Sequence, residues 1–234
     1  MELPILYQDD YIVAVNKPHG LLVHRSRIAN DVEISAIQIL EKQLGRKVRP
    51  AHRLDRKTSG ILLFSFDEKT DRELQKQFME RSVDKTYLAL VRGFAPQNLT
   101  IDYPLKREDG KIQEAVTHLK SLAFIEVPVP FGKFHTSRYS LVQLHPETGR
   151  MHQLRKHMAH IFHPIIGDRP HGCNKQNRFF KENWQLISML LHASQLTFQH
   201  PVSNQKLVLS AAISDEFNRI LKTFGAEEPV VVSE

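Results

Sequence analysis

Asp55 is the residue of this sequence whose neighbours most suggest chemistry. Arg53 and Arg56 flank it, and His52 lies three positions before it. A cation close to a carboxylate favours its ionised form and lowers its pKa. Such a carboxylate is a poor general acid but a workable nucleophile or electrostatic stabiliser. The simplest alternative is a surface ion pair, which an isolated Arg-Leu-Asp-Arg string would favour.

The residues after Asp55 predict how it is held. Thr58, Ser59 and Gly60 are good turn residues, and the apolar run 61–66 that follows has the character of a buried strand. Asp55 would therefore sit on a tight loop at the edge of a strand, where catalytic groups are common.

Several other segments have the pattern of strands. The opening residues, 5–15, predict two short strands around an Asp-Asp turn. Alternating apolar residues predict a strand over 85–91, which carries Tyr87. Further strands are expected at 116–127, 139–144 and 189–198.

Periodic apolar residues predict four helices. Asp67 is expected to cap the second, and Gly45 and Gly225 to end the first and the last. Strands and helices are mixed without a regular β-α-β repeat, which predicts an α+β fold with a largely antiparallel sheet. The expected helices span 33–44, 68–81, 148–162 and 214–224.

Composition narrows the class of protein. The chain has 234 residues, 41% of them hydrophobic, and a formal net charge of +6, which is common among proteins that meet a polyanion. Its single cysteine, Cys173, excludes an intramolecular disulfide and a cysteine-based zinc site. The N-terminus lacks the pattern of a signal peptide, and no apolar run approaches the ~20 residues of a membrane span. We therefore expect a cytoplasmic protein without a membrane partner.

A crowd of histidines raises the alternative of a metallohydrolase. His152, His157, His160 and His163 lie in one segment, but metal ligands on a helix must share one face. His157 and His160 meet that spacing, whereas His152 lies well around the helix, and no His-Glu-x-x-His string is present. No metal is therefore expected, and these residues are interpreted as polar helix positions and RNA-facing imidazoles.

The longer motifs resemble those of a known family. Residues 52–60 (HRLDRKTSG), followed by Ile-Leu-Leu, resemble the active-site motif of the RluA-type pseudouridine synthases. Four more segments resemble other motifs of that family in the same order, and the resemblance runs from about residue 5 to residue 213. These segments are 16–24 (NKPHGLLVH), 85–93 (KTYLALVRG), 147–158 (ETGRMHQLRKHM) and 163–168 (HPIIGD).

The resemblance implies roles for matching residues. Asp55 would be the catalytic aspartate that helps to break the bond between C1′ and uracil N1, by attack on the sugar or by elimination to a glycal. Tyr87 would stack on the target uracil and take part in removing the C5 proton. The alternative interpretation of Tyr87 is an aromatic core residue on a strand. Arg155 would pair with Asp55; its alternative is a solvated helix face. The reaction implies neither a metal nor an organic cofactor.

A further set of residues is expected to bind the substrate. A stacked nucleotide must leave the helix before its C1′–N1 bond can react, and a planar cation offsets part of that cost. Arg53 would fill the vacated space, and Leu154 would pack near the base. His52, Thr58 and Lys17, on the same motifs, complete the set.

The resemblance also implies the architecture. We expect a pseudouridine synthase fold with a mostly antiparallel or mixed sheet, flanking helices and a central RNA-binding cleft, in a single catalytic domain over 1–234. About fifteen residues precede the first motif, so an N-terminal S4-type RNA-binding module is expected to be absent.

Loop sequences suggest the substrate. Residues 127–139, His171-Gly172 and 176–179 are similar to the branch that modifies uridine 65 of tRNA. Ribosomal RNA or dual specificity, and a non-catalytic RNA-binding protein, are the alternatives. A monomer without an obligate protein partner is expected. The basic residues expected to contact phosphates are Arg46, Lys47, Arg49, Arg56, Lys57, Lys106, Arg107, Arg150, Lys156, Arg169, Lys175 and Arg178.

Overall fold

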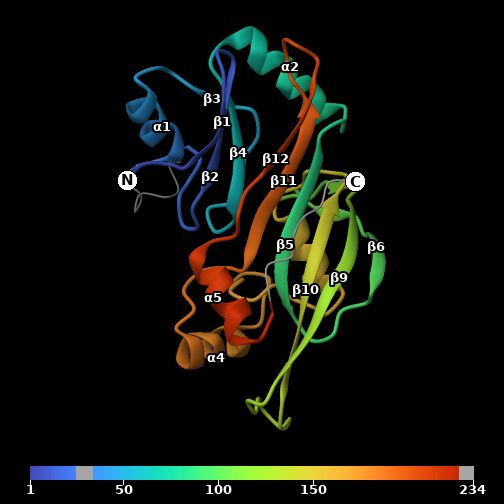
Figure 1. Cartoon of the computed structure of the whole chain (residues 1–234). Coiled ribbons are helices and arrows are strands. Elements are labelled where there is room, and N and C mark those ends of the chain that lie inside the picture. Colours follow the sequence, from blue (N-terminus) through green and yellow to red (C-terminus); the bar gives the residue numbers. More distant parts are fainter. Residues whose placement is uncertain (25–33, 227–234) are drawn as a thin grey trace. The chain divides into compact units, whose positions relative to one another are not determined.

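The computed structural model describes residues 1–24 and 34–226 (Figure 1). The chain forms two compact units, and each is described by itself. The first comprises Met1–Asp84 and Ala193–Ala212, and the second comprises Lys85–His192 and the described chain from Ile213 onward. The expectation of a single catalytic domain stays a prediction.

The first unit is built on a sheet whose strands follow the order β1 (Ile5–Gln8), β2 (Ile12–Lys17), β4 (Ser59–Ser65) and β11 (Leu191–Gln199). Short β3 (Arg49–Pro50) also pairs with β4, and β12 (Lys206–Ser210) pairs with β11. The β2–β4 pair is antiparallel and places Lys17 opposite Gly60. The start of the first motif, residues 16 and 17, therefore lies beside the strand that follows the Asp55 loop.

Helices α1 (Ala36–Leu44) and α2 (Glu68–Met79) also belong to the first unit, and both begin at side-chain caps. Helix α1 has a capping box at Ser35 and ends at Gly45 with φ +67°. Helix α2 begins at Asp67, whose carboxylate accepts from Thr70 N at 2.9 Å. The predicted caps are confirmed; residue 33, where the first helix was expected to begin, lies outside the described residues.

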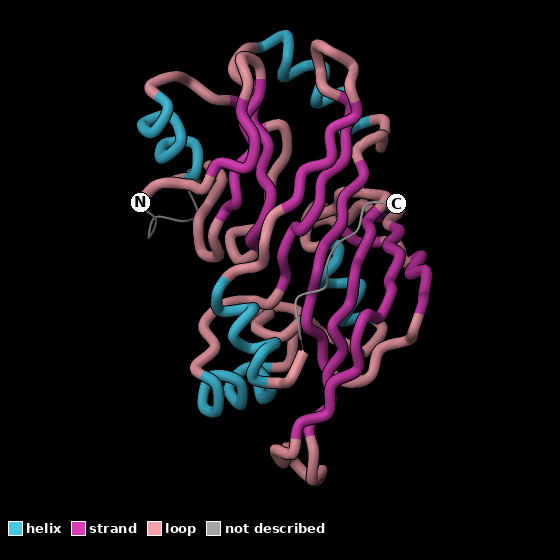
Figure 2. The backbone as a smooth tube through the Cα atoms, viewed as in Figure 1, coloured by secondary structure: helices cyan, strands magenta, loops and turns pink. Residues whose placement is uncertain are grey.

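The second unit has an antiparallel sheet in the order β5 (Asp84–Arg92), β10 (Ser137–Pro146), β9 (Val116–Val127) and β6 (Asn98–Asp102). Strands β9 and β10 form a long hairpin, visible as two extended magenta strands in Figure 2. A separate small ladder pairs β7 (Leu105–Lys106) with β8 (Ile112–Gln113).

Helices α3 (Gln153–His160), α4 (Asn174–Trp184) and α5 (Asp215–Thr223) belong to the second unit. Phe180 of α4 and Phe217 and Leu221 of α5 share one buried cluster with residues of β5 and β10. None of the helices in the described part of the chain is long and apolar enough to span a membrane.

The α+β class with a mostly antiparallel sheet is confirmed, but one helix differs from expectation. The predicted helix over 148–162 is wrong in its length, because α3 begins at Gln153. The buried Thr148 hydroxyl donates to Gln153 Oε1 at 2.6 Å, and His152 has φ +57°, so the preceding residues form a turn. Helix α4 was not predicted at all, since its sequence is polar apart from Phe179, Phe180 and Trp184.

Candidate functional site

Lys17 lies beside the Asp55 loop in the first unit and is fully buried. Its Nζ donates to the carbonyl oxygens of Pro18 (3.0 Å), Leu21 (2.9 Å) and Arg56 (3.4 Å). Burial lowers the pKa of Lys17 to about 7, against the opposing effect of the Asp55 carboxylate. Lys17 therefore ties the first motif to the active-site motif; substrate binding by its side chain stays a prediction.

The Asp55 loop is held on both sides. Thr58 N donates to Asp55 O at 3.0 Å, which closes a turn, and Thr58 is buried. Gly20 N donates to Arg56 O at 2.8 Å, and Arg56 Nε donates back to Gly20 O at 3.1 Å. Asp55 itself is half-buried. The loop thus presents a partly accessible carboxylate on a backbone that is fixed by its neighbours.

Gly60 ends the motif where strand β4 begins, and its position admits no side chain. Its φ is +110°, and a Cβ there would lie 2.2 Å from the carbonyl oxygen of Ala193 in β11. Two backbones therefore approach each other directly after the Asp55 loop, which explains the glycine at this point.

His52 and Arg53 differ in exposure. The His52 Nε2 accepts from Leu63 N at 3.2 Å, and its ring stacks on Phe78 with centroids 4.9 Å apart. These contacts anchor the start of the motif to β4 and α2. Arg53 is exposed, as a side chain that meets RNA would be. Substrate binding by both residues stays a prediction.

Tyr87 and Leu154 lie together in the second unit. Leu154, from α3, is 7% exposed and belongs to a buried cluster with Ala89 and Val91 of β5. Tyr87 is half-buried and packs against that cluster. Two of the predicted site residues thus meet at one buried cluster, although Tyr87 and Leu154 are 67 positions apart in the sequence.

Arg155 forms a buried, two-pronged ion pair with Asp168. Its Nε donates to Asp168 Oδ2 and a terminal nitrogen to Oδ1, both at 2.8 Å, and the side chains are 5% and 1% exposed. Such a fork fixes the plane of the guanidinium. Arg155 is therefore oriented by its own unit, and its pairing with Asp55 stays a prediction.

Gln153 fixes the beginning of α3. Its Nε2 donates to Val116 O (2.9 Å) and Thr117 Oγ1 (3.0 Å), while its Oε1 accepts from Thr148 Oγ1 and Arg150 N. Because Gln153 immediately precedes Leu154 and Arg155, this buried network sets the position of both against strand β9.

The histidines in and around α3 all contact other side chains or backbone atoms of the second unit. His152 Nδ1 and His171 Nε2 share a hydrogen bond of 2.9 Å, which requires at least one neutral ring. Burial lowers the pKa of His171, and Arg155, His152 and Lys156 add to this effect, while Asp168 opposes it. His157 contacts Thr117 Oγ1 and Tyr103 O, both at 3.0 Å.

The remaining two histidines are also engaged. His160 stacks on Tyr103, and His163 Nδ1 lies 2.8 Å from Arg92 O. Among the residues that the structure describes, no group of three or more His, Cys, Asp or Glu side chains is placed to hold a metal ion.

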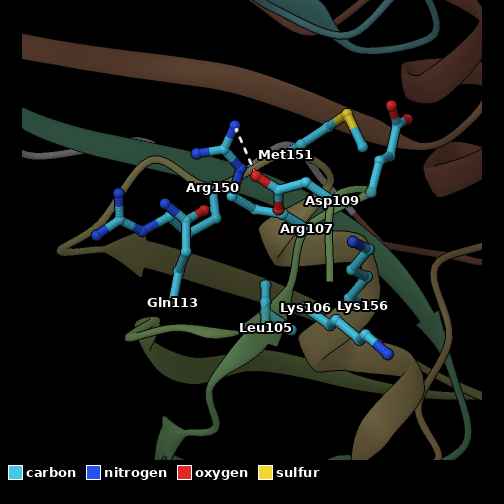
Figure 3. Close-up of a pocket in the computed structure, with 9 residues that line it drawn as sticks. Leu105, Lys106, Arg107, Asp109, Gln113, Arg150, Met151 and Lys156 are labelled. Atoms are coloured by element: carbon cyan, nitrogen blue, oxygen red, sulfur yellow. Dashed lines mark ion pairs between the residues drawn. The ribbon is translucent and has the colours of Figure 1, made fainter. Parts of the chain in front are cut away.

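Four of the predicted phosphate contacts surround a hollow of about 370 Å³ in the second unit (Figure 3). They come from the β7–β8 hairpin and from residues at and before α3. Arg107 pairs with Asp109 at 3.5 Å, the ion pair that is dashed in Figure 3. Arg150 Nε donates to Glu114 O at 3.0 Å. The four cations are Lys106, Arg107, Arg150 and Lys156, and Glu108, Asp109, Leu105, Gln113 and Met151 complete the lining.

The sequence did not predict the contacts of three residues in and around α3. These residues are Gln153, which bonds to β9, Asp168, which pairs with Arg155, and His171, which bonds to His152. Asp168 ends the HPIIGD motif, which follows the motif that carries Arg155. The presence of an acidic residue in one motif and an arginine in the other could have suggested the Arg155–Asp168 pair. His171 carries no local signal of its contact with His152, because nineteen residues separate them in the sequence.

Comparison with known proteins identifies the family of the chain. The family model described as RNA pseudouridylate synthase matches residues 11–160. A relative named tRNA pseudouridine synthase C from Vibrio parahaemolyticus is 45% identical over 242 residues, covering 99% of this chain and 98% of the relative. A protein of the same name from Salmonella typhi is 44% identical and covers 95% of this chain and 90% of the relative.

Solved structures agree with the fold. The human RNA pseudouridylate synthase domain containing 4 superposes with a TM-score of 0.74 at 25% identity, over 97% of this chain and 94% of that one. The human RNA pseudouridylate synthase domain containing 1 has a TM-score of 0.71 at 23% identity, which supports the fold alone. The motifs at Asp55 and Tyr87, and most of the motif that carries Arg155, lie inside the matched range, and the chain belongs to the RNA pseudouridylate synthase family.

Proposed function

We propose that this protein converts uridine 65 of tRNA to pseudouridine, with Asp55 as the catalytic aspartate. The observation that carries the proposal is the end-to-end similarity to proteins named tRNA pseudouridine synthase C, in a chain whose Asp55 loop is tied down by the buried Lys17. The hydrogen bonds of Lys17 and Gly20 to Arg56 O support a rigid loop, which a reacting carboxylate needs.

The proposed reaction needs the uridine outside its stack. Arg53, exposed on the loop, fills the space that the nucleotide leaves, and Tyr87 and Leu154 offer the extruded uracil an aromatic and apolar surface. In one route the Asp55 carboxylate attacks C1′ as the C1′–N1 bond breaks, and after the uracil has turned, C5 displaces the carboxylate from C1′. In the other route Asp55 takes the C2′ proton as N1 leaves, which gives a glycal, and the proton returns to C2′ when C5 bonds to C1′. Tyr87 takes part in removing the C5 proton. Arg155, aimed by Asp168, pairs with the Asp55 carboxylate.

The basic hollow supports the choice of a polyanionic substrate. Lys106, Arg107, Arg150 and Lys156 bring four positive charges around one cavity, with two carboxylates beside them. Such a cluster favours the phosphate backbone without reading its sequence. We further propose that the enzyme works in the cytoplasm as a monomeric, single-domain catalyst and needs no protein partner.

The test of the catalytic role is Asp55→Asn. We expect this change to reduce pseudouridine formation in tRNA by at least about 10³-fold, because the amide neither attacks nor carries charge, while tRNA binding survives. Asp10→Asn, a change at an exposed turn residue of the same unit, serves as the control and should retain activity. Normal modification by Asp55→Asn would refute the mechanism and favour a role for this chain in binding alone.

The test of the substrate is a map of pseudouridine in total tRNA and rRNA from cells with and without the protein. Loss confined to tRNA uridine 65 is the expected result. Loss in ribosomal RNA as well would identify a dual-specificity enzyme, and loss in ribosomal RNA alone would refute the tRNA assignment.

A further inference from the structure

Phe162 occupies a position at the end of α3 that normally suits glycine. His163 N donates to Met158 O at 2.9 Å and Phe162 N to Ala159 O at 3.0 Å, which is the hydrogen-bond pattern of a Schellman motif. In that motif the residue after the C-cap is left-handed, and Phe162 has φ +64°. Glycine adopts this conformation freely, whereas a side chain is strained there.

Packing does not explain the phenylalanine. Its side chain is 86% exposed, so the fold buries almost none of its apolar surface. In the described part of the chain, Phe162 is the only apolar residue with a left-handed backbone apart from glycine. The other non-glycine residues in this conformation are Arg81, His152, Gln185 and Asn204. The protein thus carries both backbone strain and an exposed aromatic ring at one point.

The turn at Phe162 is attached to an aromatic and cationic surface. His163 Nδ1 lies 2.8 Å from Arg92 O, so the turn is bonded to the end of β5. Two residues on, Phe94 is 42% exposed and lies under the Arg138 guanidinium, 5.2 Å from its ring centroid. Arg92 is exposed, and Arg138 also pairs with Glu126 at 3.2 Å.

We propose that Phe162 contacts the RNA substrate by stacking on a nucleobase that lies outside the uridine pocket. An aromatic face accepts any base, and neighbouring arginines provide for the flanking phosphates. Backbone strain together with an exposed aromatic side chain is expected of a residue that binds a ligand, because neither feature stabilises the fold. The proposal rests on the proposed function in that the RNA is taken to be tRNA.

The decisive variant is Phe162→Gly, because relief of the backbone strain should stabilise the fold while loss of the aromatic ring should weaken tRNA binding. We expect its Tm to rise by about 2–4 °C, since glycine removes the strain. We expect its Kd for tRNA and its KM to rise at least about fivefold, since a base–aromatic stack is lost. The kcat should remain that of the unaltered protein, because the variant leaves Asp55, Tyr87 and Arg155 in place.

Gln185→Gly is the matched control. Gln185 ends α4 with φ +53° and is exposed, so this change relieves the same kind of strain at another helix end of the same unit. It should raise Tm and leave the Kd for tRNA unchanged. Phe162→Trp keeps an aromatic face and should bind tRNA like the unaltered protein.

Two results would overturn the proposal. One is a Phe162→Gly protein whose Kd for tRNA and sedimentation coefficient both equal those of the unaltered protein. The other is a Phe162→Gly protein that binds tRNA normally but sediments differently from the unaltered protein, which would make Phe162 a contact between copies of the chain. If the unaltered protein binds tRNA but forms no pseudouridine in it, the proposed function fails while the binding comparison still tests Phe162.

Discussion

Asp168 illustrates how a single buried charge organises a site. Its carboxylate is 1% exposed and holds Arg155 through two hydrogen bonds of 2.8 Å. Burying both charges costs desolvation free energy that offsets their attraction, so the main effect of the pair is to orient the Arg155 guanidinium. Removing one partner leaves the other as an uncompensated buried charge, which is strongly unfavourable.

We therefore expect Asp168→Asn to lower the free energy of unfolding by about 3 kcal/mol or more and to impair pseudouridine formation. Asp109→Asn is the matched control, because Asp109 pairs with Arg107 at an exposed site where such pairs contribute about 0–1 kcal/mol. Urea denaturation of both proteins provides the comparison. Equal effects of the two changes would show that the Arg155 pair is not structurally important.

Lys17 gives stability a defined pH dependence. Its folded-state pKa, about 7, lies below its ordinary value of 10.5, so unfolding takes up a proton between these pH values. The contribution of this group to the free energy of unfolding is therefore lowest below pH 7 and increases as the pH rises toward 10.5.

Lys17→Met should remove this dependence, because methionine has similar length and no proton to exchange. Between pH 7 and 10.5, the unfolding free energy of the unaltered protein should rise relative to that of Lys17→Met. Denaturant titrations across the window measure the difference, with Lys69→Met at an exposed position of α2 as the control. Parallel curves for the unaltered protein and Lys17→Met would contradict the burial argument.

At the scale of elements, the junction between the Asp55 loop and β4 tolerates the least change. Gly60 combines a φ of +110° with a backbone neighbour, the Ala193 carbonyl, at 2.2 Å from where a Cβ would lie. Gly20 has a φ of +86° but nothing within 4 Å of that point.

We expect Gly60→Ala to destabilise the protein by more than about 3 kcal/mol, since a strained backbone and a clash act together. Gly20→Ala should lower stability by about 1–2 kcal/mol, because strain acts there alone. Thermal unfolding of both variants tests the difference, and a Gly60→Ala protein as stable as Gly20→Ala would disprove the close approach of the two strands.

Local pattern predicted some elements well and failed at others for physical reasons. Strand β9 matches its predicted range, 116–127, because a long run without Gly or Pro leaves few alternatives. Helix α3 was predicted too long, since the side chain of Thr148 and the left-handed His152 hold a turn that periodicity does not reveal. Helix α4 was missed because its burial depends on Phe180 and Gln176 meeting other elements.

The same distinction applies to the candidate site. Motif strings identified Asp55, Tyr87 and Arg155 as candidates, and the second unit brings Tyr87 together with Leu154. The partners Asp168 and His171 are set by tertiary contacts across thirteen and nineteen residues, so no local spacing predicted them. The burial of Lys17 was equally hidden, because a lysine in a motif is ordinarily interpreted as a ligand contact.

For the whole molecule, the net charge of +6 and the basic hollow predict salt-sensitive binding of tRNA. Replacing Lys106 and Lys156 together by Gln should weaken binding and reduce the slope of log K against log salt by about 1–2 units. A double change at the exposed Lys69 and Lys76 of α2 alters the net charge equally and should leave the slope nearly unchanged. Equal slopes for both double variants would place the phosphate contacts elsewhere.

The depressed pKa of Lys17 also makes it a reporter of motion. An amine with a pKa of about 7 is largely unprotonated just above neutrality, which is the form that acylating reagents attack, yet this amine is fully buried. Reagent can reach it when the contact between the first motif and the Asp55 loop opens, so the rate of acylation at Lys17 measures that opening. Mass spectrometry of the labelled protein, with and without RNA, would thus follow the opening of the Asp55 loop without any engineered probe.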